Sequence, residues 1–291
     1  MSEEWEYSQS AAAKSEYEKS GYLLEDFKLF HLKDTTEHAY AYHYHEFHKI
    51  LWFVEGKAEY HIEGKAYQLE PYDIVAVEKG QIHKPEVDYR IPYERYVLYI
   101  SDGFLGEHSG EGYDLKECFV GAGRESSSVI RLGASDSNHL LAVLQKLEEN
   151  ENMPSYAGKL YSNILFLEFL IELNRICIEK PGVYHKTARY DKKVVEIVQY
   201  INDNLARELS IDRLSEQFYL SKYHMMRKFK EETGYSVHQY ILEKRILLAR
   251  EMLMKGIPAT TACMECGFQD YSTFTRAFKN KLHVLPSEIG I

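Results

Sequence analysis

One helical pattern occurs twice in the C-terminal part of the chain, and this repeat constrains the fold more than any other feature. A short helix, a turn and a longer helix are predicted at 211–233 and again at 259–281. Ser210 and Ser221 are suitable N-caps in the first unit, and Gly234 can end it. Asp270 is a suitable cap for the last helix of the second unit. This arrangement is typical of the helix-turn-helix, whose second helix enters the major groove of DNA.

The second helix of each unit has an apolar face and a polar, basic face. Met225 and Phe229 lie four residues apart on the apolar face of the first, and Phe274 and Phe278 repeat this spacing in the second. The repeat therefore predicts an all-α domain over 191–291 that binds double-stranded DNA.

The outward face of each second helix supplies the predicted DNA contacts. Arg227 and Arg276 occupy matching positions, and an arginine that donates two bonds to guanine is the commonest specific base contact. Lysines on these helices more naturally meet phosphates. The predicted contacts are Lys222, Tyr223, Met226, Arg227, Lys230, Tyr271, Ser272, Thr273, Thr275, Arg276 and Lys279.

The N-terminal half shows a different pattern, with short alternating segments separated by turns at Gly56, Gly64 and Gly80. Evenly spaced short strands are typical of an antiparallel sandwich or barrel. We predict strands at 28–32, 39–44, 49–54, 58–62, 66–69, 74–77 and 96–100, then loops with at most one strand over 101–135. The predicted class is α+β multidomain: an N-terminal antiparallel β-barrel with flanking helices, followed by an all-α domain with two helix-turn-helix units.

Two amphipathic helices are predicted between these parts. Leu140 and Leu147 belong to one apolar stripe, and Leu160, Ile164 and Ile178 belong to another. These helices either pack onto their own domain or pair with a second copy of the chain, and both possibilities stay open. The predicted organisation is a polar arm at 1–20, a barrel at 21–135, a helical dimerisation or linking region at 136–180, a linker at 181–190 and the helical domain at 191–291.

Both halves resemble one known family. The stretch from Leu209 to Gly234, with the stretch from Gly267 to Lys279 and Pro286 downstream, closely resembles the DNA-binding domain of AraC/XylS transcription regulators over about 190–288. The stretch 43–56, followed by 71–74 and 80–83, resembles the cupin effector domain common in that family. The resemblance implies that 222–230 and 271–279 enter successive major grooves on one face of DNA, about 34–36 Å apart.

The resemblance also implies a small-molecule site inside the barrel. Histidines at i and i+2 direct both imidazoles to one face of a strand. The predicted effector-binding residues are His43, His45, Trp52, Tyr60 and His83, with Glu94 and Arg95 as a further polar pair. Because the chain has 24 Tyr, which combine an aromatic face with a hydroxyl, a sugar is a natural effector.

The same three histidines, His43, His45 and His83, are the candidates for a metal ion. In metal cupins a glutamate stands four residues after the second histidine, and here that position is Lys49. A cation in the ligand ring disfavours a tightly held metal, so no cofactor is predicted, although three histidines can bind one weakly. Pro71-Tyr72-Asp73 also replaces the usual Pro-Gly-Asp.

Charge and composition indicate the general class of the protein and its partners. Residues 187–291 have 16 Lys and Arg against 13 Asp and Glu, residues 1–186 have 19 against 32, and the whole chain has a net charge of -10. A mildly basic tail is compatible with a polyanionic partner. The sequence has no apolar run of the ~18 residues that a membrane span needs and no secretory signal, and four cysteines are no disulfide framework. We therefore expect a cytoplasmic protein with no membrane partner.

Together these features predict a DNA-binding transcription regulator, not an enzyme, that responds to a small molecule and more often activates than represses. The expected partners are double-stranded DNA, the effector, RNA polymerase if the protein activates, and a second copy in a homodimer. Two alternatives stay open: a metal-dependent cupin enzyme with an accessory helical domain, and a constitutive DNA-binding protein whose barrel only dimerises.

Overall fold

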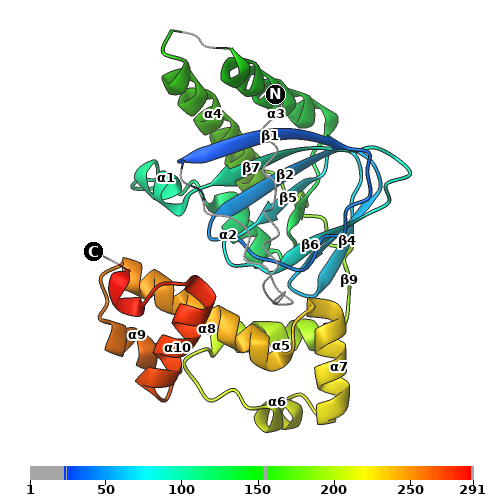
Figure 1. Cartoon of the computed structure of the whole chain (residues 1–291). Helices are drawn as coiled ribbons and strands as arrows, with labels where there is room; N and C mark the ends of the chain where they lie inside the picture. Colours follow the sequence, from blue (N-terminus) through cyan, green and yellow to red (C-terminus); the bar gives the residue numbers. More distant parts are fainter. Residues whose placement is uncertain (1–22, 24, 154–155, 290–291) are drawn as a thin grey trace.

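The computed structural model describes residues 23, 25–153 and 156–289, as a β-rich N-terminal domain and a helical C-terminal domain (Figure 1). The predicted arm at 1–20 lies outside the described residues. The strands are β1 (Phe27–Asp34), β2 (His48–Glu55), β3 (Ala58–Ile62), β4 (Lys65–Gln68), β5 (Ile74–Val77), β6 (His83–Val87), β7 (Tyr93–Ile100), β8 (Val129–Ile130) and β9 (Arg189–Tyr190). They form a five-stranded sheet in the order β1-β7-β2-β5-β8 and a four-stranded sheet in the order β6-β3-β4-β9. All pairings between these strands are antiparallel, so the predicted α+β class with an antiparallel β domain is confirmed.

The side chains of β2 alternate between two apolar cores. Leu51 and Phe53 point between the two sheets, whereas Ile50 and Trp52 point to the opposite face of the five-stranded sheet. A strand directs successive side chains to opposite faces, so a fully buried strand supplies both cores. We call the space between the sheets the barrel interior; its apolar wall includes Leu51, Phe53, Tyr60, Tyr67, Val75, Val77, Tyr93 and Val97.

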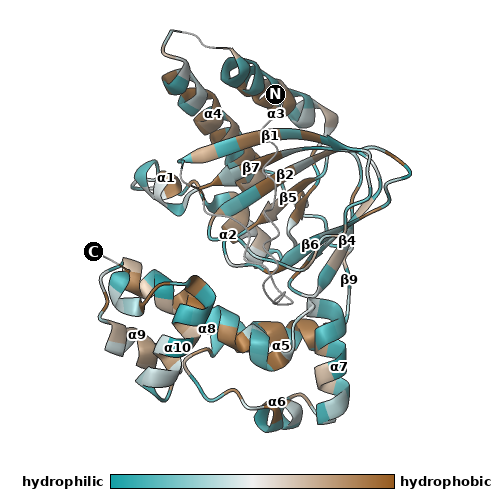
Figure 2. Cartoon of the chain, viewed as in Figure 1, coloured by the Kyte–Doolittle hydropathy of each residue, from teal (hydrophilic) through white to brown (hydrophobic). Residues whose placement is uncertain are grey.

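Helices cover the outer face of the five-stranded sheet (Figures 1 and 2). The two long helices α3 (Ala134–Asn152) and α4 (Gly158–Glu179) pack against each other, and α4 places Phe166 and Phe169 in the core that contains Trp52. The prediction of loops over 101–135 is wrong, because α1 (Asp102–Glu107) and α2 (Glu117–Arg124) lie there together with β8. Both helices are too short for a clear 3.6-residue periodicity, and tertiary burial of their few apolar side chains stabilises them.

Two strand predictions also need correction. Residues 39–44 form no strand; only His43 makes an isolated antiparallel bridge, to His83. The strand β6 was missed, because Pro85 and its charged neighbours hide an alternation in which His83 and Pro85 are buried. In the predicted linker, Arg189 and Tyr190 pair with β4 and extend the smaller sheet.

The C-terminal domain has two apolar cores joined by one helix. Its helices are α5 (Lys192–Asp203), α6 (Ile211–Gln217), α7 (Lys222–Thr233), α8 (Val237–Met254), α9 (Ala259–Glu265) and α10 (Tyr271–Leu282). The first half of α8 packs with α5, α6 and α7 around Phe229, and its second half packs with α9 and α10 around Phe274 and Phe278. Because both helix-turn-helix units pack on α8, this helix sets their relative orientation.

The turn at Tyr72 provides a stability prediction. Tyr72 is exposed and has a φ of 73°, a conformation in which residues with a Cβ atom are strained. We expect Tyr72→Gly to raise the free energy of unfolding by about 0.5–1 kcal/mol, since relief of strain exceeds the added chain entropy of glycine. Urea denaturation would measure it. Tyr113→Gly, at an exposed tyrosine outside the positive-φ residues, is the matched control and should give no gain.

Candidate DNA-binding surface and effector site

The helices α7 and α10 are anchored by their apolar faces, as predicted. Met225, Phe229, Phe274 and Phe278 are all at most 1% exposed. Ser221 accepts a bond from the backbone N–H of His224, and the caps at Ser210, Ser236 and Asp270 form in the same way. Each helix therefore begins at a fixed residue and presents its opposite face outward.

The predicted DNA contacts lie on these outward faces. All eleven positions are exposed except Thr275, which is half-buried and whose Oγ1 has no partner among the described residues. Arg227 donates to Glu231 at 2.8 Å, and Lys222 pairs with Asp212 at 2.5 Å. Arg276 and Lys279 form no ion pair within the described part of the chain. Two arginines of this kind on separate exposed helices are suited to reading base edges in two grooves.

A groove of about 920 Å³ lies between the two helix-turn-helix units. Its lining includes Arg207, His238 and Asn280, which the sequence analysis missed, together with Arg276. The spacing of polar residues on one helix face could not predict these residues, because they come from a loop, from α8 and from the end of α10. They add basic and polar groups beside the predicted contacts.

Three histidines meet beside the barrel interior. The ring centroids of His43 and His83 are 4.4 Å apart, and His45 is 5.0 Å from each. In His43 and His83, Nδ1 donates to the backbone carbonyl two residues earlier, at Ala41 and Gln81, which leaves Nε2 as a lone-pair acceptor. Burial lowers the pKa of His43 to about 4 and the pKa of His83 well below its usual value, so both rings are neutral near pH 7.

Lys49, Tyr60 and Arg95 extend this cluster into the barrel interior. The Tyr60 ring stacks 6.0 Å from His83, and the Lys49 ammonium lies 5.7 Å from the Tyr60 ring. Arg95 lies 4.2 Å from the Tyr93 ring and pairs with Asp34 at 2.7 Å. Five predicted effector residues therefore come together: His43, His45, Tyr60, His83 and Arg95.

Trp52 and Glu94 do not belong to this cluster, and the structure does not bring them together with the other predicted effector residues. Trp52 lies against Phe169 of α4, with ring centroids 6.4 Å apart, on the outer face of the sheet. Glu94 points to the same outer side and pairs with Lys33 at 2.5 Å. Along β2 and β7 the interior residues are the odd-numbered ones, so once the structure shows which face is interior, period two along each strand places Tyr93 inside and Trp52 and Glu94 outside.

The three histidines also meet the geometric requirement for a metal site. One ring nitrogen from each of His43, His45 and His83 lies within 4.8 Å of the others. Lys49 lies close enough to lower the pKa of both His43 and His83, and this cation opposes a divalent ion at the same point. A second group, Glu59, His61 and Glu86, is at the surface, where Arg189 already pairs with Glu59.

The segment 42–46 joins the histidine cluster to the DNA-binding domain. Tyr42 donates to the backbone carbonyl of Glu232 near the end of α7 at 3.2 Å. Tyr44 donates to Glu243 of α8 at 3.0 Å, and Glu46 pairs with Arg250 of the same helix at 2.6 Å. These contacts bury one face of α8 against the N-terminal domain.

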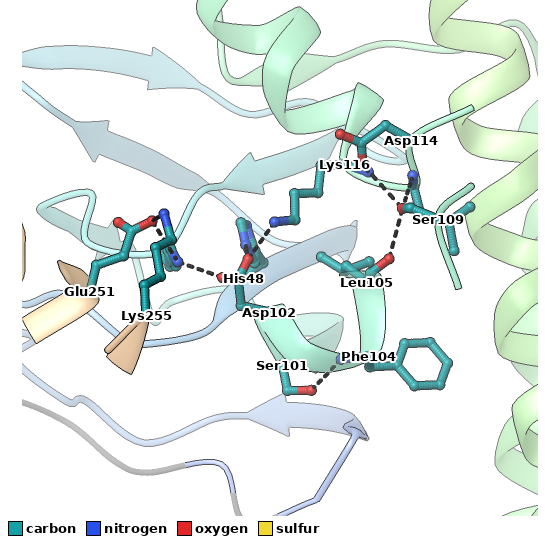
Figure 3. Close-up of polar contacts among 12 residues, drawn as sticks. His48, Ser101, Asp102, Phe104, Leu105, Ser109, Asp114, Lys116, Glu251 and Lys255 are labelled. Atoms are coloured by element: carbon teal, nitrogen blue, oxygen red, sulfur yellow. Dashed lines mark hydrogen bonds and ion pairs between the residues drawn. The ribbon is translucent and has the colours of Figure 1, made fainter. Parts of the chain in front are cut away.

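Neighbouring loops strengthen this docking. Glu63 accepts from Lys244 at 2.6 Å and from Tyr240, and Lys244 also donates to the carbonyl of Gly80 at 2.8 Å. A charged network lies at the other end of α8, where Glu251 pairs with Lys255 (Figure 3). There Lys79 bridges Asp102 at 2.6 Å and Glu251 at 3.9 Å. The two domains thus share an interface that combines these polar contacts with apolar ones, since Tyr44 and Ile82 pack in the core that contains Phe229.

An all-α domain with two exposed helices of this kind, docked on a β domain whose interior holds a cluster of buried polar groups, defines a DNA-binding protein with a ligand-binding domain. Residues 29–134 match the model of the AraC-like ligand binding domain, and residues 214–290 match that of a helix-turn-helix domain. The chain belongs to the AraC family of transcription regulators. It is therefore a DNA-binding regulator and not an enzyme.

Relatives are similar over most of the chain. The HTH-type transcriptional activator RhaS of Escherichia coli (strain SMS-3-5 / SECEC) is 23% identical over 257 residues, which cover 85% of this chain and 86% of the relative. RhaS of Salmonella typhimurium is 23% identical over 86% of this chain and 87% of its own length. Among solved structures, ToxT from Vibrio cholerae is 16% identical over 91% of this chain and 97% of that chain, with a TM-score of 0.34. None of the helices that the structure describes has the length and apolar character needed to cross a bilayer.

Proposed function

We propose that this regulator binds a paired DNA site through α7 and α10 and activates transcription when a small molecule occupies the histidine cluster. The predicted contact residues on α7 and α10 are the DNA-reading groups in this proposal. RhaS of both genera is named an activator, and this supports activation rather than repression.

The observation that carries the proposal is the two-sided segment 42–46. Its odd residues, His43 and His45, join the histidine cluster, whereas its even residues, Tyr42, Tyr44 and Glu46, contact the DNA-binding domain. Tyr44 and Lys281 of α10 both bond to Glu243, which is 2% exposed. A ligand that displaces His43 or His45 therefore shifts Tyr42, which contacts the end of α7, and Tyr44, which is linked through Glu243 to the end of α10.

This geometry meets the thermodynamic requirement for control. An effector changes DNA affinity only if it binds two arrangements of the protein with different affinity. In this proposal ligand binding at the histidine cluster moves the segment 42–46, so the docked and the shifted arrangement differ at the effector site itself.

We also propose that α4 forms a homodimer interface. Ile164, Ile171 and Ile178 are exposed and spaced seven residues apart. Glu168 and Arg175 lie between them on the same exposed stripe. If two copies pack antiparallel about Ile171, Ile164 meets Ile178 and Glu168 meets Arg175, as a twofold, self-complementary interface requires. The partner on this surface is therefore a second copy of the chain.

Selection of sites from random duplex DNA by the full chain tests the proposed DNA binding. We expect enrichment of repeated or paired half-sites, because a dimer with two reading helices per copy gains avidity when the spacing fits. Enrichment of single, unpaired sites would contradict the dimeric mode, and no enrichment at all would contradict sequence-specific binding without effector.

Variants of the segment 42–46 test the control by a ligand. His43→Ala is expected to leave affinity for the selected site unchanged and to abolish the response of a promoter–reporter fusion across a panel of carbon sources. Tyr44→Phe removes a bond to a buried carboxylate and should reduce the coupling by about 1–3 kcal/mol.

Tyr113→Phe, at an exposed tyrosine away from the interface, is the matched control and should respond like the wild type. A full response from His43→Ala would show that the effector binds elsewhere. A constitutive wild type that responds to nothing in the panel would favour a barrel that only dimerises.

A further inference from the structure

Lys49 is a buried cation that has no carboxylate partner among the described residues. Its side chain enters the barrel interior from β2 and is 7% exposed. No ion pair within residues 23, 25–153 and 156–289 includes Lys49, and the neighbouring cation Arg95 pairs with Asp34. Burying an unpaired ammonium costs several kcal/mol, so the site favours an anion from outside this part of the chain.

Three polar groups around Lys49 are also buried without a partner among the described residues. The hydroxyls of Tyr60 and Tyr93 and the Nε2 of His83 are buried and have no hydrogen-bond partner in the part of the chain that the structure describes. All three residues are at most 1% exposed. Buried polar atoms are normally satisfied, and each such exception calls for a partner. Two hydroxyls and a lone-pair nitrogen are suited to the hydroxyl groups of a ligand.

We propose that the effector is a small hydroxylated carboxylate, whose carboxylate binds Lys49 and whose hydroxyls bond to Tyr60, Tyr93 and His83. This inference rests on the proposed function, in which the barrel holds the effector, and it specifies the chemical class. A sugar acid fits these groups better than the neutral sugar predicted from tyrosine content, because a neutral sugar brings no charge to balance Lys49.

The protonation of Lys49 makes the proposal measurable. Burial and the charge of Arg95 lower the pKa of Lys49 to about 7. Tyr99 lies opposite it on β7, and the other titratable groups near it include His43, His83 and Tyr60. The two histidines have lowered pKa values and Tyr60 a raised one, so all three stay neutral between pH 6 and 8. Over this range Lys49 is therefore the group of these four that changes charge.

Acetate and its neutral isostere acetamide are the probes, added to the full chain without DNA. We expect acetate, but not acetamide, to move the side-chain NMR signal of Lys49. Because the ammonium form is lost as the pH rises through 7, acetate affinity should fall about tenfold between pH 6 and 8. Lys49→Met, which keeps the length of the side chain, should abolish acetate binding without lowering the melting temperature.

Galacturonate and galactose, compared by thermal shift on the full chain, extend the test to hydroxylated ligands. We expect the acid, and not the sugar, to stabilise the wild type, and Lys49→Met to lose that effect. Equal acetate binding by wild type and Lys49→Met, or stabilisation by galactose alone, would overturn the proposal. In that case, a loss of the reporter response in His43→Ala would show that the proposed function stands. Only the anionic class of the effector would then be wrong.

Discussion

Replacing Arg276 by alanine is expected to weaken binding to the selected site by about 1–3 kcal/mol and to relax sequence preference at one base position. Arg276 projects from α10 and forms no ion pair within the described part of the chain, so it is free to donate to guanine. Arg227 occupies the matching place on α7, and its bond to Glu231 at 2.8 Å is an exposed i,i+4 pair. Such a pair is worth only about 0.3–0.5 kcal/mol, so Arg227→Ala should cost a similar amount to Arg276→Ala.

Fluorescence anisotropy on the selected site and on random duplex, at one fixed salt concentration, measures both variants. Lys279→Ala serves as the phosphate-contact comparison: it should weaken binding to all sequences alike and reduce the salt slope by about 1. Arg90→Ala, on an exposed loop of the N-terminal domain, should change neither. Equal losses on random DNA for Arg227→Ala and Arg276→Ala would show that these arginines contact phosphates instead of bases.

Glu231 offers a converse test of the same surface. Its carboxylate holds Arg227 at 2.8 Å and Lys228 at 3.6 Å, and it would lie near DNA phosphates in the proposed complex. Removing this charge with Glu231→Gln frees Arg227 and lowers repulsion. If Arg227 contacts bases, Glu231→Gln should bind the selected site more tightly than the wild type does. Its gain in affinity for random DNA should be smaller.

The helical domain could be predicted from the sequence because its signals are local. Ser221 and Gly234 mark the ends of α7 through bonds to residues within one helical turn, and both form as predicted. The repeat of this pattern at Asp270 adds independent support. Neither cap depends on a distant part of the chain, so pattern and structure agree to within a residue or two.

The effector site could be predicted only in part, because its residues converge through non-local pairing. His43 and His83 meet across an isolated bridge between segments far apart in sequence, and the family resemblance alone brought them together. Trp52 lies apart from the cluster although β2 itself was predicted, because position along a strand does not reveal which face is interior when both faces are buried. From the sequence, Lys49 could be interpreted only as a cation that disfavours a bound metal ion. The structure shows in addition that it has no carboxylate partner among the described residues.

Disrupting the α4 surface should separate dimerisation from DNA reading. In the proposed antiparallel pair, Glu168 of one copy faces Arg175 of the other on each side of Ile171. Glu168→Arg places like charges opposite each other twice in the dimer, and Arg175→Glu does the same with the opposite sign. Each single variant should therefore be monomeric by analytical ultracentrifugation and lose about 10²-fold or more in affinity for a paired site, while its affinity for a single half-site stays unchanged.

The double variant Glu168→Arg with Arg175→Glu decides whether these residues pair across the dimer. It exchanges the two charges and restores opposite signs, so it should recover the dimer and the affinity for the paired site. Glu149→Arg on the exposed side of α3 introduces the same charge change outside the stripe and should remain dimeric. If both single variants stayed dimeric, the exposed isoleucines of α4 would not form the interface. If the double variant stayed monomeric, the two copies would pack through α4 in another register, because only an antiparallel arrangement centred near Ile171 brings residues 168 and 175 together twice.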